Sequence, residues 1–281
     1  MVWIEYKKAN DSIPHSWIRK IINIYKISPN IIEFLKESMK HWTINLNLHH
    51  SAGSIDINDI KIKTGIFQGD SLSPLLFCMC IDPLSKLLNT SNTGYRLKEN
   101  EKSVTVSHLL YMDDLKLYAK SDAELEKQLQ IVRHFSRDIC MEFGLDKCNK
   151  VSVKKGRQVL SGECRVEEVT IAELEGETLY KYLGIEENGQ IEHQRMRQKL
   201  RDEYILRLEK ILKTKLTSKN KIKAINQLAH PVLQYSFGII NWPQKYLNEI
   251  DVLTRKLLIK YKLFYKNNCI GRYTLSIQLF L

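Results

Sequence analysis

Tyr111-Met112-Asp113-Asp114 places two adjacent carboxylates between two apolar runs, Val104–Leu110 and Leu115–Ala119. The pattern predicts a β-hairpin with both acids at the tip of its turn. Turns favour Asp because its side chain accepts hydrogen bonds from the nearby backbone, so most Asp pairs of this kind are solvated turns. Two carboxylates at one tip are also suitable oxygen ligands for a divalent metal ion, which is the functional alternative.

A Gln-Gly loop lies upstream of this hairpin, in Gly65-Ile66-Phe67-Gln68-Gly69-Asp70-Ser71-Leu72-Ser73-Pro74. Such a loop and an Asp pair rarely occur together by chance. The loop therefore favours a functional turn over a solvated one.

The composition is that of a globular chain with a basic charge. Its 281 residues, of which 43% are hydrophobic, are enough for one large domain or two modest ones with a real core. The net charge of +11 indicates a polyanionic partner, either nucleic acid or an acidic membrane surface, unless it is only a solvated basic face. Polar residues and prolines interrupt the longest uncharged stretch, Ala224–Gln244, so no transmembrane helix is predicted.

The six cysteines lack the paired spacing of a zinc site or of a disulfide framework. We expect reduced, buried thiols at Cys78, Cys80, Cys140, Cys148, Cys164 and Cys269. No apolar leader of the secretory type opens the sequence.

Apolar periodicity predicts a mixed α+β fold for the first two thirds of the chain. Strands are expected at 1–6, in a hairpin of 42–48 with 60–63, and in short pieces over 151–182. Helices are expected at 15–25, at 30–40, at 75–88 with an interruption at Asp82-Pro83, and after a cap at Ser121–Glu124. The capped helix has an apolar face formed by Leu125, Leu129, Val132, Phe135 and Ile139.

The character of the sequence changes near Glu186, where we place a domain boundary. Beyond it, Met196, Leu200, Tyr204, Leu208 and Leu212 form a stripe at helical spacing, and a further helix begins at Ser218. Between Arg195 and Lys223 there are eleven Lys or Arg against three Asp or Glu. These helices are either a solvated face or a surface that binds the nucleic-acid backbone.

In their order along the chain, five motifs together resemble the reverse transcriptases of non-LTR retrotransposons, those of type-1 retrotransposable element Pol polyproteins. They are a first-carboxylate segment in 3–18, the Gln-Gly loop at 65–77, the Asp pair at 111–114, and the segments 143–148 and 182–184. The resemblance implies a right-hand polymerase: a palm at 1–185, with an antiparallel sheet and packed helices, then a basic helical thumb at 186–281. A group II intron maturase or a telomerase-type polymerase shares the palm and is the alternative within this class.

The resemblance implies an RNA-directed DNA polymerase that extends a DNA primer on an RNA template with deoxynucleoside triphosphates. It implies two Mg²⁺ or Mn²⁺ ions held by Asp113, Asp114 and Glu5, with Lys147 as a proton donor to pyrophosphate. The implied nucleotide-binding residues are Gln68, Gly69, Asn10 and Tyr6, where Gly69 permits close backbone approach. The implied contacts to primer and nucleic acid are Tyr182, Leu183, Gly184, Arg195, Arg197, Lys199, Lys213, Lys215, Lys219 and Lys221.

Two residues depart from the family pattern. Glu5 stands where the family has Asp, and its extra methylene displaces the carboxylate by about an ångström, an error that can cost roughly 10²-fold in rate. Asn10 stands where the family has the aromatic ring that rejects ribonucleotides. We therefore expect impaired turnover and weak sugar discrimination.

The resemblance also implies that the finger subdomain would precede Met1 and that a Cys/His knuckle and endonuclease would follow Leu281. The sequence is thus expected to be a retroelement fragment, truncated at both ends. The alternative function is a catalytically inactive remnant that binds nucleic acid. A nuclear location is expected if the chain works as a retroelement polymerase, and the basic segment Lys213–Lys223 is a candidate import signal. The oligomeric state stays open.

Overall fold

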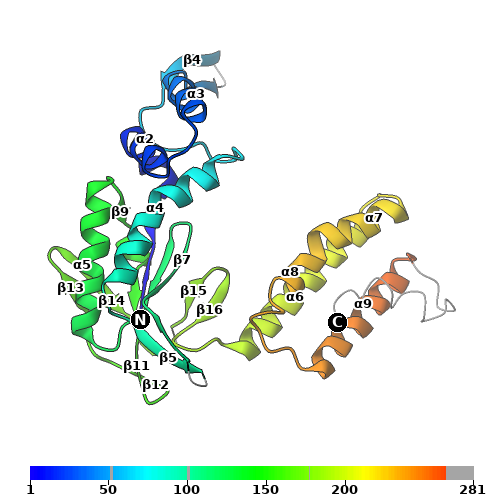
Figure 1. Cartoon of the computed structure of the whole chain (residues 1–281). Coiled ribbons are helices and arrows are strands. Elements are labelled where there is room, and N and C mark those ends of the chain that lie inside the picture. The colour runs from blue at the N-terminus through cyan, green and yellow to red at the C-terminus, as the bar shows by residue number, and fades with distance from the viewer. Residues whose placement is uncertain (51–52, 100–101, 177, 264–281) are drawn as a thin grey trace. The chain divides into compact units, whose positions relative to one another are not determined.

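A computed structural model describes residues 1–50, 53–99, 102–176 and 178–263. The chain divides into two compact units, Met1–Leu183 and Gly184–Leu281 (Figure 1). It mixes helices and strands, as expected for an α+β protein. Within the described ranges, no helix combines the length and the apolar character that crossing a bilayer requires. The identification of the two units as palm and thumb stays a prediction.

A six-stranded sheet organises the first unit. Its strands follow the order β13 (Cys164–Val166), β14 (Val169–Glu173), β10 (Asn149–Lys150), β1 (Val2–Ile4), β8 (Asp114–Leu117) and β7 (His108–Tyr111). All neighbours pair antiparallel except β10 and β14, which are parallel. The expected antiparallel sheet therefore contains one parallel pair. The reason is the connection, because the chain leaves β10 through β11 (Ser152–Lys154), β12 (Arg157–Val159) and β13 before it returns as β14.

Strand β1 lies in the middle of this sheet, between β8 and β10. Its side chains alternate between the two faces, as strand geometry requires. Val2 and Ile4 belong to the main core, whereas Trp3 packs on the other face and stacks on Tyr180 with ring centroids 4.7 Å apart. All three residues of β1 are buried. This central strand carries the chain directly to Glu5.

The main core also receives the apolar faces of several helices. They are α2 (His15–Ile24), α3 (Pro29–Lys40), α4 (Ser73–Thr90) and α5 (Asp122–Asp138). The predicted cap of α5 is confirmed, because the Ser121 hydroxyl accepts a hydrogen bond from the Glu124 amide at 3.3 Å. The predicted interruption of α4 is wrong. The helix continues through Pro83, since burial of Ile81 and Leu84 beside it compensates for one missing backbone hydrogen bond.

Several two-stranded ribbons extend from the first unit. They are β2 (Tyr6–Lys7) with β9 (Glu142–Phe143), β3 (Thr43–His50) with β4 (Gly53–Lys61), β5 (Tyr95–Glu99) with β6 (Lys102–Val106), and β11 with β12. The β3–β4 ribbon confirms the hairpin predicted at 42–63, although residues 51 and 52 of its turn lie outside the described part. The apolar run Val104–Leu110 is divided between β6 and β7. Buried Ser107 separates them, and its carbonyl accepts a hydrogen bond from the Tyr118 amide at 2.8 Å.

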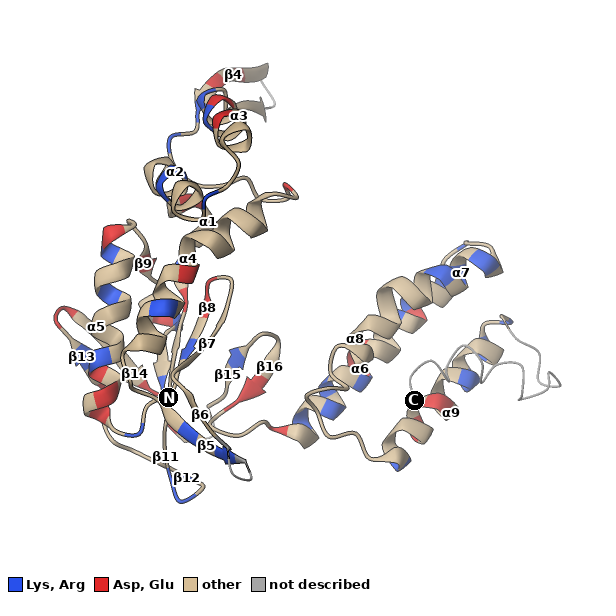
Figure 2. Ribbon diagram, viewed as in Figure 1, with Lys and Arg blue, Asp and Glu red and all other residues tan. Residues whose placement is uncertain are grey.

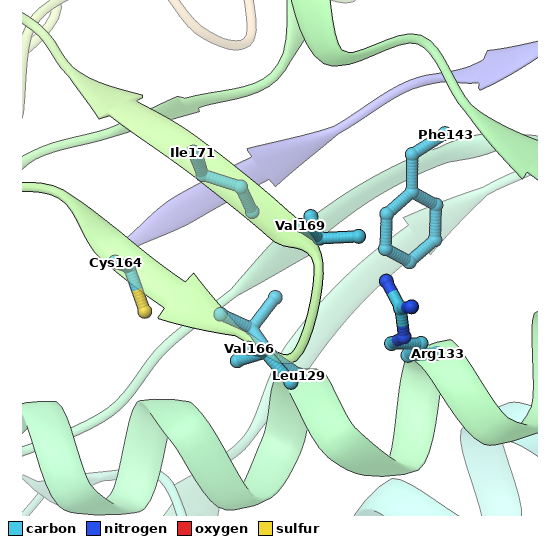
Figure 3. Close-up of a pocket in the computed structure, with 7 residues that line it drawn as sticks. All are labelled: Leu129, Arg133, Phe143, Cys164, Val166, Val169 and Ile171. Atoms are coloured by element: carbon cyan, nitrogen blue, oxygen red, sulfur yellow. The ribbon is translucent and has the colours of Figure 1, made fainter.

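Helix α5 packs against the β13–β14 hairpin at one end of the sheet (Figure 3). The junction is lined by Leu129, Arg133, Phe143, Cys164, Val166, Val169 and Ile171, and it has no room for a water molecule. Arg133 forms an ion pair with Glu167 at 2.5 Å, in the turn of the hairpin. The apolar face predicted for this helix is therefore confirmed as a sheet-packing face.

The second unit begins with β16 (Ile185–Glu187), and helices make up most of its described part. Its helices are α6 (His193–Lys213), α7 (Ser218–Ala224), the π-helical segment η2 (Ile225–Ala229), α8 (His230–Gln234) and α9 (Gln244–Lys260). The predicted stripe of α6 is confirmed, since Met196, Tyr204, Leu208 and Leu212 are buried. The Tyr204 hydroxyl hydrogen-bonds Thr254 at 3.0 Å and so joins α6 to α9.

The described cysteines are free thiols, but they are not all buried. Cys80, Cys148 and Cys164 are buried, as predicted. Cys78 and Cys140 are exposed, so that part of the prediction is wrong. Cys78 lies on α4, where its thiol donates to the Met112 sulfur at 3.6 Å, and Cys140 follows the end of α5. Cys269 lies outside the described residues.

Candidate active site

The two adjacent acids lie in the tight turn between β7 and β8. Tyr111 and Asp114 pair across this turn, so Met112 and Asp113 are its central residues. Met112 has a φ of 54°, which suits the turns that join antiparallel strands through two residues. The hairpin predicted from the Asp pair is therefore confirmed, with Asp113 in the turn and Asp114 at the start of β8.

Strand β1 brings Glu5 alongside the turn. Ile4 pairs with Leu115 in antiparallel register, so the residue after Ile4 lies beside Asp114. The Glu5 carbonyl also accepts a hydrogen bond from the Gly144 amide at 2.8 Å, which ties this position to the segment that follows β9. Sheet pairing thus brings together residues that lie far apart in the sequence.

The three carboxylates influence one another electrostatically. The pKa of Asp114 is raised above its ordinary value, first because burial disfavours the charged form and then because Asp113 and Glu5 are negative. The positive charge of Lys147 acts in the opposite direction. Negative charge is therefore concentrated around Asp114, and a bound cation would reduce the repulsion between these carboxylates.

Lys147 already supplies one positive charge at this place. It ends a short 3₁₀ helix, η1 (Leu145–Lys147), and its ammonium donates a hydrogen bond to Glu5 within an ion pair. This partner is the main cause of a raised pKa at Lys147. The side chain of Lys147 is 57% exposed and that of Glu5 is 30% exposed, so the pair lies at the surface.

The Gln-Gly loop packs against the short helix α1 (Ala9–Ser12). The Ile66 amide donates to the Asn10 carbonyl at 2.8 Å, and the Gln68 amide group donates to the Asp11 carboxylate at 3.5 Å. These contacts bring Gln68 and Asn10 to the same region, although both were predicted from separate motifs. Gly69 has a φ of +90°, and nothing lies within 4 Å of a Cβ built there. In this structure Gly69 is therefore required by its backbone conformation, not by a close neighbour.

Aromatic and histidine side chains support the loop, and no sequence motif predicts this role for them. The Trp42 and Phe67 rings lie 4.7 Å apart, and the His15 ring meets Trp42 edge-on at 5.3 Å. His15 also hydrogen-bonds the Gly65 carbonyl at 3.0 Å through its Nε2 atom. These residues hold the start of the loop to α2.

Tyr6 does not present its side chain to this region. It is 4% exposed, and its hydroxyl hydrogen-bonds Ser136 on α5 at 2.9 Å. Burial raises the pKa of the phenol. The nucleotide-binding role predicted for Tyr6 is not supported, because β2 turns this side chain into the main core.

The segment predicted to hold the primer includes the end of β15 (Tyr180–Tyr182). Leu183 and Gly184 follow with φ values of 47° and 81°, so the chain turns sharply there. Tyr182 contributes its ring to an aromatic group around Lys116, whose ammonium lies 5.1 Å from the Trp3 ring and 5.5 Å from the rings of Tyr118 and Tyr182. Lys116 is buried, which its charge would not predict.

Lys and Arg residues recur along α6 and α7 (Figure 2), but several of the predicted ones have partners inside the second unit. Arg195 and Lys199 both form ion pairs with Glu186. The Arg197 guanidinium donates to the Asn241 carbonyl at 2.6 Å and lies over the Tyr246 ring.

Farther along, Lys213 pairs with Glu209 at 3.7 Å and Lys221 donates to the Leu212 carbonyl at 2.7 Å. Lys215 is exposed on the segment that joins α6 to α7, and Lys219 is exposed near the start of α7.

Comparison with known proteins identifies the family. The family model described as reverse transcriptase (RNA-dependent DNA polymerase) matches residues 1–186, which include the Asp113–Asp114 turn, Glu5 and the Gln-Gly loop. The chain belongs to the reverse transcriptase family. The predicted resemblance to non-LTR retrotransposon enzymes is confirmed by the relatives of this reverse transcriptase chain.

One such relative is a Pol polyprotein from the type-1 retrotransposable element R2 of Popillia japonica, 26% identical over 189 residues, or 66% of this chain and 30% of the relative. A second is the Pol polyprotein from the type-2 element R2DM of Drosophila melanogaster, 22% identical over 257 residues, or 90% of this chain and 23% of the relative. The reverse transcriptase chain thus spans less than a third of the length of either. Among solved structures, apo telomerase from Candida tropicalis aligns with 99% of this chain and 50% of that chain, at 14% identity and a TM-score of 0.39.

Reverse transcriptases use divalent metal ions, and the chemistry of the carboxylates in this chain fits them. Glu5, Asp113 and Asp114 offer only hard oxygen donors, and the pKa of Asp114 is raised first by burial and then by the negative charges of Asp113 and Glu5. Across the described residues, however, no three His, Cys, Asp or Glu side chains are gathered closely enough to hold a metal ion. The oxygen donors of Glu5, Asp113 and Asp114 are of the type that Mg²⁺ or Mn²⁺ prefers, and strand pairing brings the residues together. Their side chains, however, do not converge on one point. Their assignment as a shared metal site stays a prediction.

Proposed function

We propose that this chain is the palm and thumb of an RNA-directed DNA polymerase that extends a DNA primer on an RNA template. The observation that carries this proposal is the position of Glu5 beside Asp114 on paired strands, next to Asp113 in the turn, within a chain of the reverse transcriptase family. The pairing of β1 with β8 brings Glu5 beside Asp114, and Asp113 directly precedes Asp114 in the β7–β8 turn.

Glu5, Asp113 and Asp114 are the residues that would hold two Mg²⁺ or Mn²⁺ ions. When bound, such ions supply Lewis-acid chemistry: they lower the pKa of the primer 3′-hydroxyl and neutralise the triphosphate. The protein's own contribution is the pairing of β1 with β8, which brings Glu5, the residue after β1, beside Asp114 at the start of β8. Lys147, which forms an ion pair with Glu5, would donate a proton to the pyrophosphate that leaves.

The Gln68–Gly69 loop and Asn10 would contact the incoming deoxynucleoside triphosphate and the template base. Their proximity, fixed by the Ile66–Asn10 hydrogen bond, supports a common role. Asn10 carries no ring that would exclude a ribose 2′-hydroxyl, so discrimination between the two sugars would be weak. Tyr182, Leu183 and Gly184 would hold the primer end, and the basic residues of α6 and α7 would contact phosphates.

Primer extension tests this function. The full chain is incubated with an RNA template, an annealed DNA primer, the four deoxynucleoside triphosphates and Mg²⁺ or Mn²⁺. We expect slow extension that Asp113→Asn abolishes and that Glu5→Asp accelerates, because shortening the side chain restores the family's reach, an effect worth up to roughly 10²-fold. Absence of product from both the wild type and Glu5→Asp would exclude the polymerase.

A second candidate is a chain that binds nucleic acid without catalysis. One observation that favours it is the ion pair with Lys147, which engages the Glu5 carboxylate. Another is that no three His, Cys, Asp or Glu side chains among the described residues lie close enough to hold a metal ion. Binding to an RNA–DNA duplex that weakens steeply with salt, together with no extension by Glu5→Asp, would identify this second function.

A further inference from the structure

The Glu5–Lys147 ion pair joins two residues that are separated by 142 positions in the sequence. The Glu5 carboxylate that would serve as a cation ligand is thus already neutralised by an ammonium of the same chain. Since Glu5 is one methylene longer than Asp, it extends farther toward the lysine of η1. We therefore interpret the Glu at position 5, where the family has Asp, and its ion pair with Lys147 as linked features.

The electrostatics of the neighbourhood agree with this interpretation. Glu5 and Asp113 both raise the pKa of Asp114, whereas Lys147 lowers it. Asp113 also contributes to the raised pKa of Lys147. The ammonium therefore compensates for the same cluster of negative charge that a divalent cation would stabilise.

The side chain of Lys147 also has space to move away from Glu5. It lines an open cavity of about 600 Å³ together with Lys7, Lys8, Glu142, Gly144 and Asp146. The negative charge of Asp146 also raises the pKa of Lys147. Asp146 and Glu142 both line this cavity. A change of rotamer would carry the ammonium from Glu5 into a cavity that offers other acidic partners.

We propose that Lys147 is an internal counter-ion of the carboxylate site, which competes with divalent cations for Glu5. In the cation-free chain its ammonium neutralises Glu5, and it withdraws into the neighbouring cavity when that carboxylate turns to a cation. Binding is weakened by the free energy of the ion pair that is broken. The proposal rests on the proposed function, because it assumes that Glu5 is a cation ligand. Lys147 is a positioning residue in this role.

Mn²⁺ binding to the full chain, measured by calorimetry without nucleotide or nucleic acid, tests the proposal. Lys147→Met removes the ammonium and keeps the length of the side chain. We expect it to lower the Kd for Mn²⁺ by about fivefold, the upper range for an exposed ion pair. Lys147→Arg, which keeps the pair, and Lys154→Met, which removes one exposed charge from β11, should change the Kd by less than about twofold.

A double-mutant cycle separates the ion pair from the general effect of charge. In a Glu5→Gln background, Lys147→Met should change the Kd by less than about twofold, because no pair remains to be broken. An equal gain in both backgrounds would overturn the proposal, as would unchanged or undetectable binding in Lys147→Met.

The outcome for the proposed function is distinguishable. If Asp113→Asn weakens Mn²⁺ binding while Lys147→Met has no effect, the carboxylate site stands and only the counter-ion role fails. If Asp113→Asn has no effect either, the site itself is wrong, and primer extension would fail with it.

Discussion

Gly65 lies so close to Asp11 that a Cβ built on it would come within 2.7 Å of the Asp11 Cα atom. Its φ of +87° is also a conformation that other residues avoid. We expect Gly65→Ala to push the Gln-Gly loop off α1 and to lower the free energy of unfolding by about 3 kcal/mol or more, because backbone atoms cannot yield. Urea denaturation measures this loss.

Gly156→Ala is the matched control for that substitution. Gly156 has a φ of +76°, but nothing lies within 4 Å of its Cβ position. We expect it to cost only about 1 kcal/mol, the conformational part of the effect. Equal losses in the two variants would show that the contact with Asp11 is unimportant.

Tyr6→Phe tests whether Tyr6 is a core residue. Ser136 donates to the Val132 carbonyl at 2.6 Å, so the Tyr6 hydroxyl is the donor in its own bond to Ser136. Its removal leaves a buried acceptor unpaired and should lower the free energy of unfolding by about 1 kcal/mol. The KM for deoxynucleotides should not change. A raised KM with unchanged stability would restore the nucleotide-binding role.

His15 gives the loop a dependence on pH. Burial is the main cause of a lowered pKa, whereas the hydrogen bond to Gly65 acts to raise it. Because the unfolded chain takes up a proton near the ordinary value of 6.5 and the folded chain resists it, stability falls as the pH drops below that value. Stability stops falling once the pH is below the pKa of His15 in the folded chain.

We therefore expect the wild type to lose more stability than His15→Gln between about pH 7.5 and about pH 5.5. Urea denaturation at the two pH values measures the difference. His41→Gln, on the exposed end of α3, is the control and should behave as the wild type does. Parallel losses in the wild type and His15→Gln would refute a contribution from His15.

Lys215 and Lys219 should carry much of the nucleic-acid affinity of the second unit, because both are exposed. Replacing either by Ala should weaken binding of an RNA–DNA duplex and reduce the slope of log K against log salt by about 0.9. Lys154→Ala changes the charge equally in the first unit and serves as the control. If all three variants had the same slope as the wild type, these lysines would not contact phosphate.

Much of the fold was accessible from the sequence because its strongest signals are local. Apolar runs on both sides of Asp113-Asp114 predicted the β7–β8 hairpin, and three- and four-residue spacing predicted α5 and α6. These patterns reflect the periods of single elements, which need no knowledge of the partner. The cap at Ser121 was accessible for the same reason.

What the sequence did not predict depends on distant partners. The parallel pair β10–β14 involves a strand of two residues, too short to show a period. Lys116 and Lys150 are buried, where charge predicts exposure, because aromatic rings surround the first and Asp122 pairs with the second at 2.8 Å. The Glu5–Lys147 pair likewise arises only when β1 and η1 meet.

The central position of β1 also has a consequence for how the protein is made. The two edges of strand Val2–Ile4 pair only with residues 115–117 on one side and 149–150 on the other. At the usual pace of translation, roughly 7 to 30 s pass between synthesis of Val2–Ile4 and synthesis of residues 149–150, the last of these partners. During that interval an apolar segment waits on the ribosome without its full set of neighbours, and chaperones that shield nascent chains would have a client in these few residues.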